Sequence, residues 1–276
     1  MTDAYIVGAV RSAGGKKNGR LSKIHPIDLG AEVVDALVAK TGVAVSEIDD
    51  LIFGCVSQVG AQSSNIARNI CLSPVLGEVV PGTTVDRQCG SGQQAMHFAA
   101  QGVLSGTQDL VIAGGVESMS QVPIGANIID GYKAEHGLPY GKKMSERYPG
   151  VQFNQFAGAE MLAHKYELTQ NELNAFAFDS HVKAKRAVLE GRFKDEIVAI
   201  QIELEDGTTE SHEQDEGNRM DATLGAIAGL QPLQENGLLS AANASQICDG
   251  AAAVMIANGA TCRRLGLKPL ARIIAM

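Results

Sequence analysis

The chain lacks the features that mark several large classes of protein. No apolar run approaches the length needed to cross a bilayer, and the start, Met1-Thr2-Asp3-Ala4, lacks the charged and then apolar layout of a signal peptide. Acidic residues outnumber basic ones, 31 against 23, and the net charge of -8 argues against a nucleic-acid binder. We therefore expect a cytoplasmic protein that binds neither nucleic acid nor membrane.

Paired cysteines are missing as well. The cysteines are odd in number and widely spaced, and they include no CxxC pair: Cys55, Cys71, Cys89, Cys248 and Cys262. This pattern predicts neither a disulfide framework nor a zinc site, and we expect no metal. All except Cys89 have small or apolar neighbours, which predicts buried and unreactive thiols.

The 276 residues, 45% of them hydrophobic, are sufficient for a large globular core. Strand-like and helix-like segments alternate over residues 4–113 and again from residue 249. This alternation predicts an α/β fold with a mainly parallel sheet that is covered on both faces. The predicted strands are residues 4–10, 51–56, 79–85, 110–113, 249–256 and 270–276. The predicted helices are residues 27–40, 63–72, the run that follows Cys89, and residues 157–165, 170–190 and 260–265.

Between these α/β parts the sequence changes character. Residues 119–157 are rich in Gly, Pro, Tyr and Asn without a sustained period, which predicts a long irregular excursion. Thr169, with Glu172 three positions later, predicts a capping box at the start of a helix. The span 203–216 is strongly acidic and is predicted to be a solvated loop.

Residues 86–95, Asp-Arg-Gln-Cys-Gly-Ser-Gly-Gln-Gln-Ala, carry the strongest chemical signal. They join a β-prone run to a helix-like run, so Cys89 is expected at a helix N-terminus, where unpaired N–H groups and the helix dipole favour an anion. Such a position favours the thiolate, which is the nucleophilic form of cysteine. Gly90 and Gly92 leave room for a carbonyl group to approach the sulfur. The segment predicts a nucleophile that accepts an acyl group.

The segment around Cys89 resembles the nucleophile block of the thiolase family, and other segments resemble that family's motifs in the same order. These are residues 9–12 (Ala-Val-Arg-Ser), 114–120 (Gly-Gly-Val-Glu-Ser-Met-Ser), 191–197 (Gly-Arg-Phe-Lys-Asp-Glu-Ile), 215–219 (Asp-Glu-Gly-Asn-Arg), 230–232 (Leu-Gln-Pro), 243–245 (Asn-Ala-Ser) and 249–253 (Asp-Gly-Ala-Ala-Ala). The resemblance spans nearly the whole chain, and the ordered set is far more specific than any one motif.

The resemblance implies two similar α/β halves with a loop domain inserted in the first half. On that plan, residues 1–118 and 249–268 form the N-terminal domain, residues 119–248 form the inserted loop domain on the CoA-binding side, and residues 269–276 begin the C-terminal domain. The family assembles as homodimers or homotetramers. It acts in fatty acid metabolism of the β-oxidation type, on acyl-CoA and CoA, with coenzyme A as a substrate and no tightly bound cofactor.

The implied reaction is thiolytic cleavage of a 3-ketoacyl-CoA, or the reverse Claisen condensation. Cys89 would take the acyl group, and its backbone N–H would help to stabilise the oxyanion. Arg219 would lie against the CoA nucleotide, and Ser245 would contact the pantetheine. Judged by the residues alone, Arg219 could instead pair with its acidic neighbours, and Ser245 could be an ordinary turn or cap residue.

Two departures from the family pattern qualify these expectations. The family's G-H-P, N-E-A-F and second-cysteine blocks do not occur in the sequence, which predicts that the second α/β half is missing and that the chain alone turns over little substrate. Residues 153–160 begin Phe-Asn-Gln-Phe, where short-chain thiolases have a His-Met-Gly run. This difference favours a degradative enzyme with a medium, long or bulky acyl chain.

Two alternatives stay open from the sequence. One is a truncated or non-catalytic thiolase-like subunit that binds CoA or a partner. The other is a relative of the 3-ketoacyl synthases, which also place a cysteine at a strand–helix turn. The matches at residues 114–120 and 215–219 favour a thiolase over a synthase.

Overall fold

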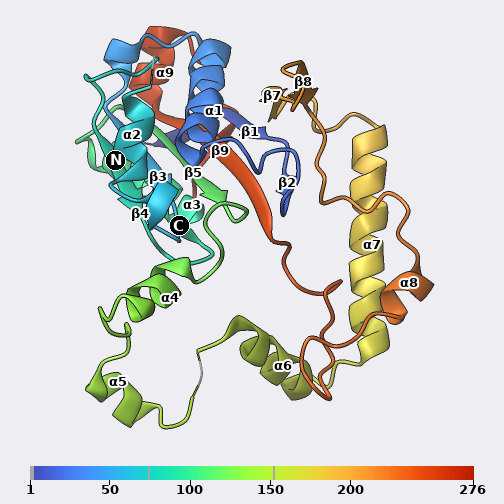
Figure 1. Ribbon diagram of the computed structural model, residues 1–276. Helices are drawn as coiled ribbons and strands as arrows, with labels where there is room; N and C mark the ends of the chain where they lie inside the picture. The colour runs from blue at the N-terminus through green and yellow to red at the C-terminus, as the bar shows by residue number, and fades with distance from the viewer. Residues whose placement is uncertain (1–2, 74, 152) are drawn as a thin grey trace. The chain divides into compact units, whose positions relative to one another are not determined.

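A computed structural model describes residues 3–73, 75–151 and 153–276 (Figure 1). Judged by residue contacts, the chain divides into two compact units. The first unit consists of Met1–Ile129, Asp195–Glu216 and Ile247–Met276, and the second of Asp130–Lys194 and Gly217–Gln246. Residues 119–129 and 195–216 of the predicted insertion therefore pack with the first unit. The family-based boundaries at residues 118 and 248 stay a prediction.

An eight-stranded sheet forms the centre of the first unit, as far as the described residues show. Its main path runs through β10 (Ala271–Arg272), β1 (Ala4–Ser12), β9 (Cys248–Asn258), β5 (Leu110–Ser118), β3 (Asp50–Gly54) and β4 (Gly82–Val85). The short strands β2 (Gly15–Lys16) and β6 (Ile197–Val198) pair with β9 and β1. Strands β1, β5, β3 and β4 run in one direction, and β9 runs antiparallel to β1 and β5. The predicted α/β fold is confirmed, with β9 as an antiparallel strand within a mixed, mostly parallel sheet.

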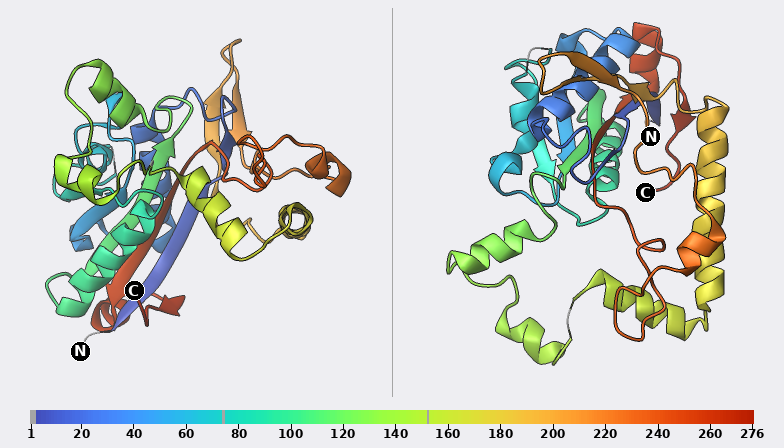
Figure 2. Two further views of the ribbon diagram at one scale, coloured as in Figure 1. Left: turned by 90° about the horizontal axis from the view of Figure 1, so that it is seen from below. Right: turned by 45° about the vertical axis from the view of Figure 1, so that its right-hand side comes forward.

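Alternate side chains of the central strands enter two separate cores, because successive residues of a strand point to opposite faces. Leu51 and Phe53 of β3 belong to one core and Ile52 to the other. The helices α1 (Pro26–Thr41), α2 (Ile66–Cys71) and α9 (Gly259–Leu265) contribute to the first core, and α3 (Ser91–Ser105) to the second. Figure 2 shows α3 on the face of the sheet opposite α1.

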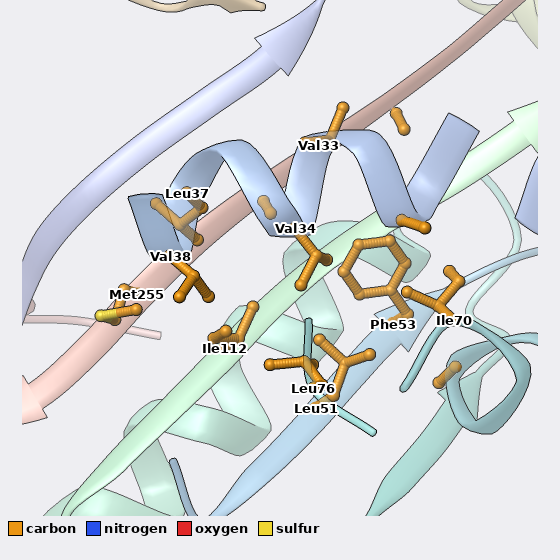
Figure 3. Packing of buried hydrophobic residues seen from close by; sticks show 14 of the residues in the cluster. Val33, Val34, Leu37, Val38, Leu51, Phe53, Ile70, Leu76, Ile112 and Met255 are labelled. Atoms are coloured by element: carbon orange, nitrogen blue, oxygen red, sulfur yellow. The ribbon is translucent and has the colours of Figure 1, made fainter. Parts of the chain in front are cut away.

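Helix α1 begins and ends where its sequence predicts. Pro26 occupies the first turn, the Nδ1 atom of His25 accepts the N–H of Ile27 at 3.2 Å, and Gly42 ends the helix in the left-handed conformation. One face of α1 is apolar and packs on the sheet (Figure 3). The side chains in this contact include Val33, Val34, Leu37 and Val38 of the helix and Leu51, Phe53, Ile112 and Met255 of the strands.

Helix α3 packs on the other face of the sheet through small residues. Ala95, Ala99, Ala100 and Val103 are fully buried and lie at helical spacing along one stripe. Small side chains let the axis of the helix approach the strands closely. The first turn of α3, which follows Cys89, is therefore held directly against the sheet.

The second unit is helical over much of its length. Its helices are α5 (Lys142–Arg147), α6 (Gln155–Lys165), α7 (Gln170–Leu189) and α8 (Leu224–Ala228), and α8 packs against α7. The predicted capping box at the start of α7 is confirmed: Thr169 Oγ1 accepts the N–H of Glu172, whose carboxylate accepts the N–H of Thr169. The expectation of an irregular excursion over 119–157 is wrong in part, because α4 (Ala126–Lys133) and α5 form there.

The acidic span 203–216 is largely exposed, as predicted, but it contains regular structure and is not simply a loop. Strands β7 (Ile200–Glu203) and β8 (Thr209–His212) form an antiparallel hairpin within the first unit. His212 is 2% exposed, and its Nε2 atom lies 3.2 Å from the carbonyl oxygen of Ala13. Burial lowers the pKa of this histidine. The polar hairpin is fixed to the first unit through this ring.

The remaining predicted elements form, but several of them differ in length from the prediction. Strand β5 continues to Ser118, beyond the predicted end at residue 113, and the predicted final strand is reduced to Ala271–Arg272. None of the helices among the described residues is long and apolar enough to cross a membrane.

Candidate active site

Cys89 lies in a tight turn between β4 and α3, two residues before the helix begins. Asp86 Oδ1 accepts the N–H of Gln88 at 2.8 Å. Ser91 Oγ accepts the N–H of Arg87 at 3.0 Å and donates to the carbonyl oxygen of Gln88 at 2.8 Å. These bonds fix both ends of the turn and leave the Cys89 side chain exposed. The predicted position at a strand-to-helix junction is confirmed.

Gln88, directly before the cysteine, has a left-handed backbone with φ of 42°. For a residue with a Cβ atom this conformation costs on the order of 1 kcal/mol. The Asp86 carboxylate, which accepts both the N–H and the Nε2 group of Gln88, holds it there. Strain of this kind concentrates in turns that must present one side chain in a defined direction. Here the residue presented is Cys89.

Gly54 at the end of β3 lets the first turn of α3 contact the strand backbone directly, and Gly115 within β5 lets β5 lie close to Gly54. A Cβ atom on Gly54 would lie 2.3 Å from the carbonyl carbon of Ser91, and one on Gly115 would lie 2.9 Å from the Gly54 oxygen. Neither distance is tolerated between real atoms, so both positions require glycine. The nucleophile turn is thereby seated on the carboxyl ends of parallel strands, where α/β proteins commonly place their ligands.

A hollow of about 520 Å³ opens beside Cys89 within the first unit. Its wall comes from the ends of β1, β3, β5 and β9 and from the first turns of α3. Glycine and alanine supply much of this wall, and the described lining residues include no histidine. The size suits part of a small organic ligand.

Two further thiols, Cys55 and Cys248, line the same hollow. Burial raises the pKa of Cys55 to about 12, helped by the negative charges of Glu117 and Asp86. Burial and the neighbouring Asp249 and Glu117 also raise the pKa of Cys248. Both groups therefore stay protonated near neutral pH, while Cys89 is exposed. The prediction that the other thiols are buried is confirmed for Cys55, Cys71 and Cys262, whereas Cys248 is only half-buried.

A half-buried carboxylate, Glu117, and a buried amide, Gln62, hold the wall that carries Cys55. Glu117 at the end of β5 accepts the N–H of Val56 at 2.8 Å, the N–H of Ser57 at 3.2 Å and the Nε2 group of Gln62 at 2.7 Å. Gln62 is fully buried, and its oxygen accepts the N–H of Ser118 at 2.7 Å. These charge-assisted bonds fix the loop after β3 against β5. Glu117 lies in the matched motif at residues 114–120, and nothing in the motif itself predicts these bonds.

Asp249, the second residue of β9, is fully buried, and its carboxylate fixes the end of β5 through hydrogen bonds. Its carboxylate accepts the N–H of Ser120 at 2.9 Å and its hydroxyl at 2.6 Å, and it lies 3.4 Å from the hydroxyl of Ser118. Two of the matched motifs, residues 114–120 and 249–253, thus meet as one hydrogen-bonded structure.

Three other matched motifs meet at Arg11. Its guanidinium donates to both oxygens of Asp215, at 2.6 and 3.0 Å, and its Nε donates to Glu196 at 2.7 Å. Burial opposes ionisation of Asp215, but the bonds from Arg11 and from the N–H of Gly14 outweigh it and lower the pKa of this carboxyl. Arg11 therefore joins β1 to segments that lie far along the sequence; Asp215, for example, is 204 residues away. This contact was not predicted from the sequence, where the only signal for it is the opposite charge of Arg11, Glu196 and Asp215 within the matched motifs.

Arg219 and Ser245, the predicted CoA contacts, both lie in the second unit and are exposed. Among the described residues Arg219 forms no ion pair, because Asp215 pairs with Arg11 and Glu216 with Lys16. Its N–H donates to Nδ1 of His181 on α7 at 3.4 Å. The described residues thus show no ion pair that would support the surface alternative for Arg219, and its role stays a prediction.

The segments that carry Arg219 and Ser245 are neighbours in the second unit. Gln246, next to Ser245, donates from Nε2 to the carbonyl oxygen of Gly217 at 2.8 Å. A Cβ atom on Gly217 would collide with the Gln246 side chain, at 2.0 Å from its oxygen. The structure thus brings these two predicted residues onto adjacent segments, whereas Cys89 belongs to the first unit.

Comparisons with known proteins agree with this arrangement. The family model described as thiolase, N-terminal domain, matches residues 4–260. The chain is 43% identical over 275 residues to a steroid 3-ketoacyl-CoA thiolase of Mycobacterium tuberculosis, with 99% of this chain and 66% of that protein covered. It is 38% identical over 283 residues to a 3-ketoacyl-CoA thiolase of Bacillus subtilis, with 99% and 70% covered.

Among solved structures, an acetyl-CoA acetyltransferase of Bacillus anthracis superposes with a TM-score of 0.87 and 33% identity, covering 99% of this chain and 70% of that one. The chain thus spans about two thirds of the length of these relatives. The family model accounts for most of the sequence, including both the Cys89 turn and the motifs that meet at Arg11 and Asp249. The chain belongs to the thiolase family.

Proposed function

We propose that the protein is an acetyl-CoA C-acyltransferase that works through an acyl group on Cys89. The observation that carries this proposal is the exposed Cys89 thiol, which lies at the start of α3 beside a hollow whose other two thiols are held protonated. A thiolate at this position can attack the thioester or ketone carbon of a substrate.

In the cleavage direction, Cys89 Sγ forms a bond to carbon 3 of a 3-ketoacyl-CoA. The bond between carbons 2 and 3 breaks, and its electron pair goes to carbon 2, which takes up a proton to give acetyl-CoA. The sulfur of free CoA then takes the acyl group from Cys89, and the thiol is restored. The backbone N–H of Cys89 and the positive end of α3 are available to stabilise the oxyanion, a contribution of about 3 kcal/mol per donor in related acyl transfers.

The proposed reaction is degradative, and the proposed substrate is a 3-ketoacyl-CoA with a medium, long or bulky acyl chain. Support comes from the Phe-Asn-Gln-Phe run at residues 153–156 and from a relative, 43% identical, that is named a steroid 3-ketoacyl-CoA thiolase. Arg219 and Ser245 are proposed to bind the CoA nucleotide and pantetheine, because both are exposed and lie on adjacent segments. We propose a homodimer or homotetramer as the working form.

Acyl transfer to Cys89 can be tested as a half-reaction. The 276-residue chain is mixed with acetyl-CoA, octanoyl-CoA and a polycyclic acyl-CoA, quenched in acid and analysed by intact mass and peptide mapping. We expect one acyl group on Cys89, formed faster with the larger acyl groups. The adduct should vanish in Cys89→Ser and persist in Cys262→Ala, which changes a buried thiol on α9.

The alternative outcomes are informative. An adduct on another cysteine would contradict the assignment of Cys89. The lack of any adduct, with CoA still bound, would favour a non-catalytic CoA-binding subunit over an acyltransferase.

A further inference from the structure

A buried carboxylate in the second unit holds the segment that leads to Ser245. Glu160 on α6 is 7% exposed. Its oxygens accept the N–H of Leu238 at 2.9 and 3.0 Å, and Oε1 also accepts the N–H of Leu239 at 2.9 Å. A buried carboxylate is stable only when such donors replace water. Glu160 therefore fixes the backbone at Leu238 and Leu239.

The Glu160 carboxylate lies where a side chain at residue 237 would extend, so residue 237 must lack a Cβ atom for the carboxylate to stay in place. A Cβ atom on Gly237 would lie 2.6 Å from Glu160 Oε1. The contact thus depends on two residues: Glu160 of α6 supplies the acceptor oxygens, and Gly237 leaves the space that the carboxylate occupies.

A tight turn passes this constraint along the chain to Ser245. Ser240 is 1% exposed and follows Leu239 directly. Asn243 Oδ1 accepts the N–H of Ser240 at 2.8 Å and its hydroxyl at 3.1 Å, and the N–H of Asn243 donates back to the Ser240 carbonyl oxygen at 3.1 Å. Ser245 follows two residues later and is exposed. Its position depends on a turn that begins at the Glu160 contact.

Arg219 has anchors of its own. Its N–H donates to His181 on α7, and its carbonyl oxygen accepts the N–H of Ala222. The segments of Arg219 and Ser245 share the bond from Gln246 to Gly217, but the Glu160 contact belongs to the Ser245 side alone, and the bonds to His181 and Ala222 belong to Arg219 alone. This difference makes a selective test feasible.

We infer that Glu160 is a positioning residue for CoA binding, which holds Ser245 toward the pantetheine without touching the ligand. The inference rests on the proposed function, in which Ser245 contacts pantetheine and Arg219 the nucleotide. Loss of the Glu160 contact weakens recognition of the pantetheine part and spares recognition of the nucleotide part.

The test compares two ligands on the whole 276-residue chain by calorimetry: CoA, and adenosine 3′,5′-bisphosphate, which lacks pantetheine. Glu160→Ala should weaken CoA binding about tenfold, the effect of losing one well-made polar contact. Its affinity for the bisphosphate should stay within about twofold, a change too small to signal a lost contact. Gly237→Ala, which displaces the same carboxylate, should have the same selective effect.

Conservative and matched variants complete the design. Glu160→Gln should lose less CoA affinity than Glu160→Ala, because one amide oxygen can still accept both N–H groups. Glu235→Ala removes an exposed glutamate from the same loop and should change neither affinity. Ser245→Ala should add little to the loss in Glu160→Ala, because both act through one contact.

Each outcome decides the matter. An equal loss of affinity for both ligands, or no loss of affinity for CoA, overturns the inference. If Glu160→Ala does not fold, the same comparison of the two affinities is made with Glu160→Gln. If the unaltered chain binds the bisphosphate and acylates Cys89 but Glu160 proves irrelevant, only this inference fails. If the unaltered chain does not bind CoA, the proposed CoA surface fails and the inference fails with it.

Discussion

At the scale of single residues, thiols that line the same hollow differ in exposure and in pKa because their surroundings differ. Cys55 and Cys89 line one wall, yet Cys55 lies under the loop that Glu117 holds, and Cys89 stands at the apex of an exposed turn. Reactivity follows the thiolate and its access to solvent, and not the residue type. The sequence singled out the cysteine that the structure exposes, because only Cys89 has two glycines and a helix start beside it.

Alkylation kinetics test this difference. With a pKa of about 12, Cys55 is ionised in only about one molecule in ten thousand at pH 8. We expect iodoacetamide to modify Cys89 at least about a hundredfold faster than Cys55, as resolved by peptide mapping over time. Raising the pH should increase the Cys55 rate about tenfold per unit, since it stays below its pKa throughout. Comparable rates at Cys55 and Cys89 would contradict the assignment.

Gly54 tests the seating of the nucleophile turn. In Gly54→Ala the new methyl group would collide with the Ser91 backbone, so α3 must shift away from β3. We expect a loss of about 1–3 kcal/mol in the free energy of unfolding, measured in urea, together with slower acylation of Cys89. Gly259→Ala is the matched control, because its methyl group meets only ordinary contacts at 3.4 Å. A fully stable and active Gly54→Ala would show that the close approach is unimportant.

At the scale of elements, the sequence predicted the helices and strands that have a regular apolar pattern, and it missed a hairpin that is defined by its turn. Helix α1 and strands β3 and β9 were found from apolar spacing. The hairpin β7–β8 was missed because acidic residues suggested a solvated loop, although Asp206-Gly207 is a typical hairpin turn and Gly207 has φ of +80°. The ties from Arg11 and Glu117 could not be predicted in detail, because they depend on contacts between distant segments.

The loop after β3 is an element whose position depends on Glu117. In Glu117→Gln, one carboxylate oxygen becomes an amide group that cannot accept the N–H of Val56 or Ser57. We expect a loss of about 1–3 kcal/mol in unfolding free energy. The pKa of Cys55 should also fall toward its ordinary value, because a negative charge that raises it is gone. Alkylation of Cys55 should accelerate in this variant and stay slow in the exposed control Glu78→Gln.

At the scale of the whole molecule, Asp35 on α1 should contribute to the pH dependence of the stability of the first unit, with a sign that its pKa determines. Burial, and then the charge of Glu32, raise its pKa from 3.8 to about 6. The folded state therefore binds the proton more tightly than the unfolded state does. This advantage is complete below about pH 4 and is lost as the pH rises through 6, so the ionised carboxylate destabilises the protein at pH 7.

Urea unfolding at two pH values tests whether the ionised Asp35 carboxylate destabilises the protein. Asp35→Asn should raise the urea midpoint at pH 7 and leave it nearly unchanged at pH 4. Glu32→Gln removes the like charge and should move the transition of the wild-type curve to lower pH. A midpoint in Asp35→Asn that falls at pH 7 would show that the carboxylate is stabilising, contrary to its raised pKa.

The central place of β9 has a consequence for the order in which the molecule folds. β1 ends at residue 12, yet its neighbour β9 begins only at residue 248, and β9 also separates β1 from β5. At the usual rate of synthesis of 5–20 residues per second, β1 must wait roughly 10–50 s for its partner. Until then the edges of β1 and β5 that face β9 are unpaired, and the wall beside Cys89 is incomplete. The nascent chain therefore depends on β9 to close the sheet, and a chaperone that shields these edges should raise the yield of native protein.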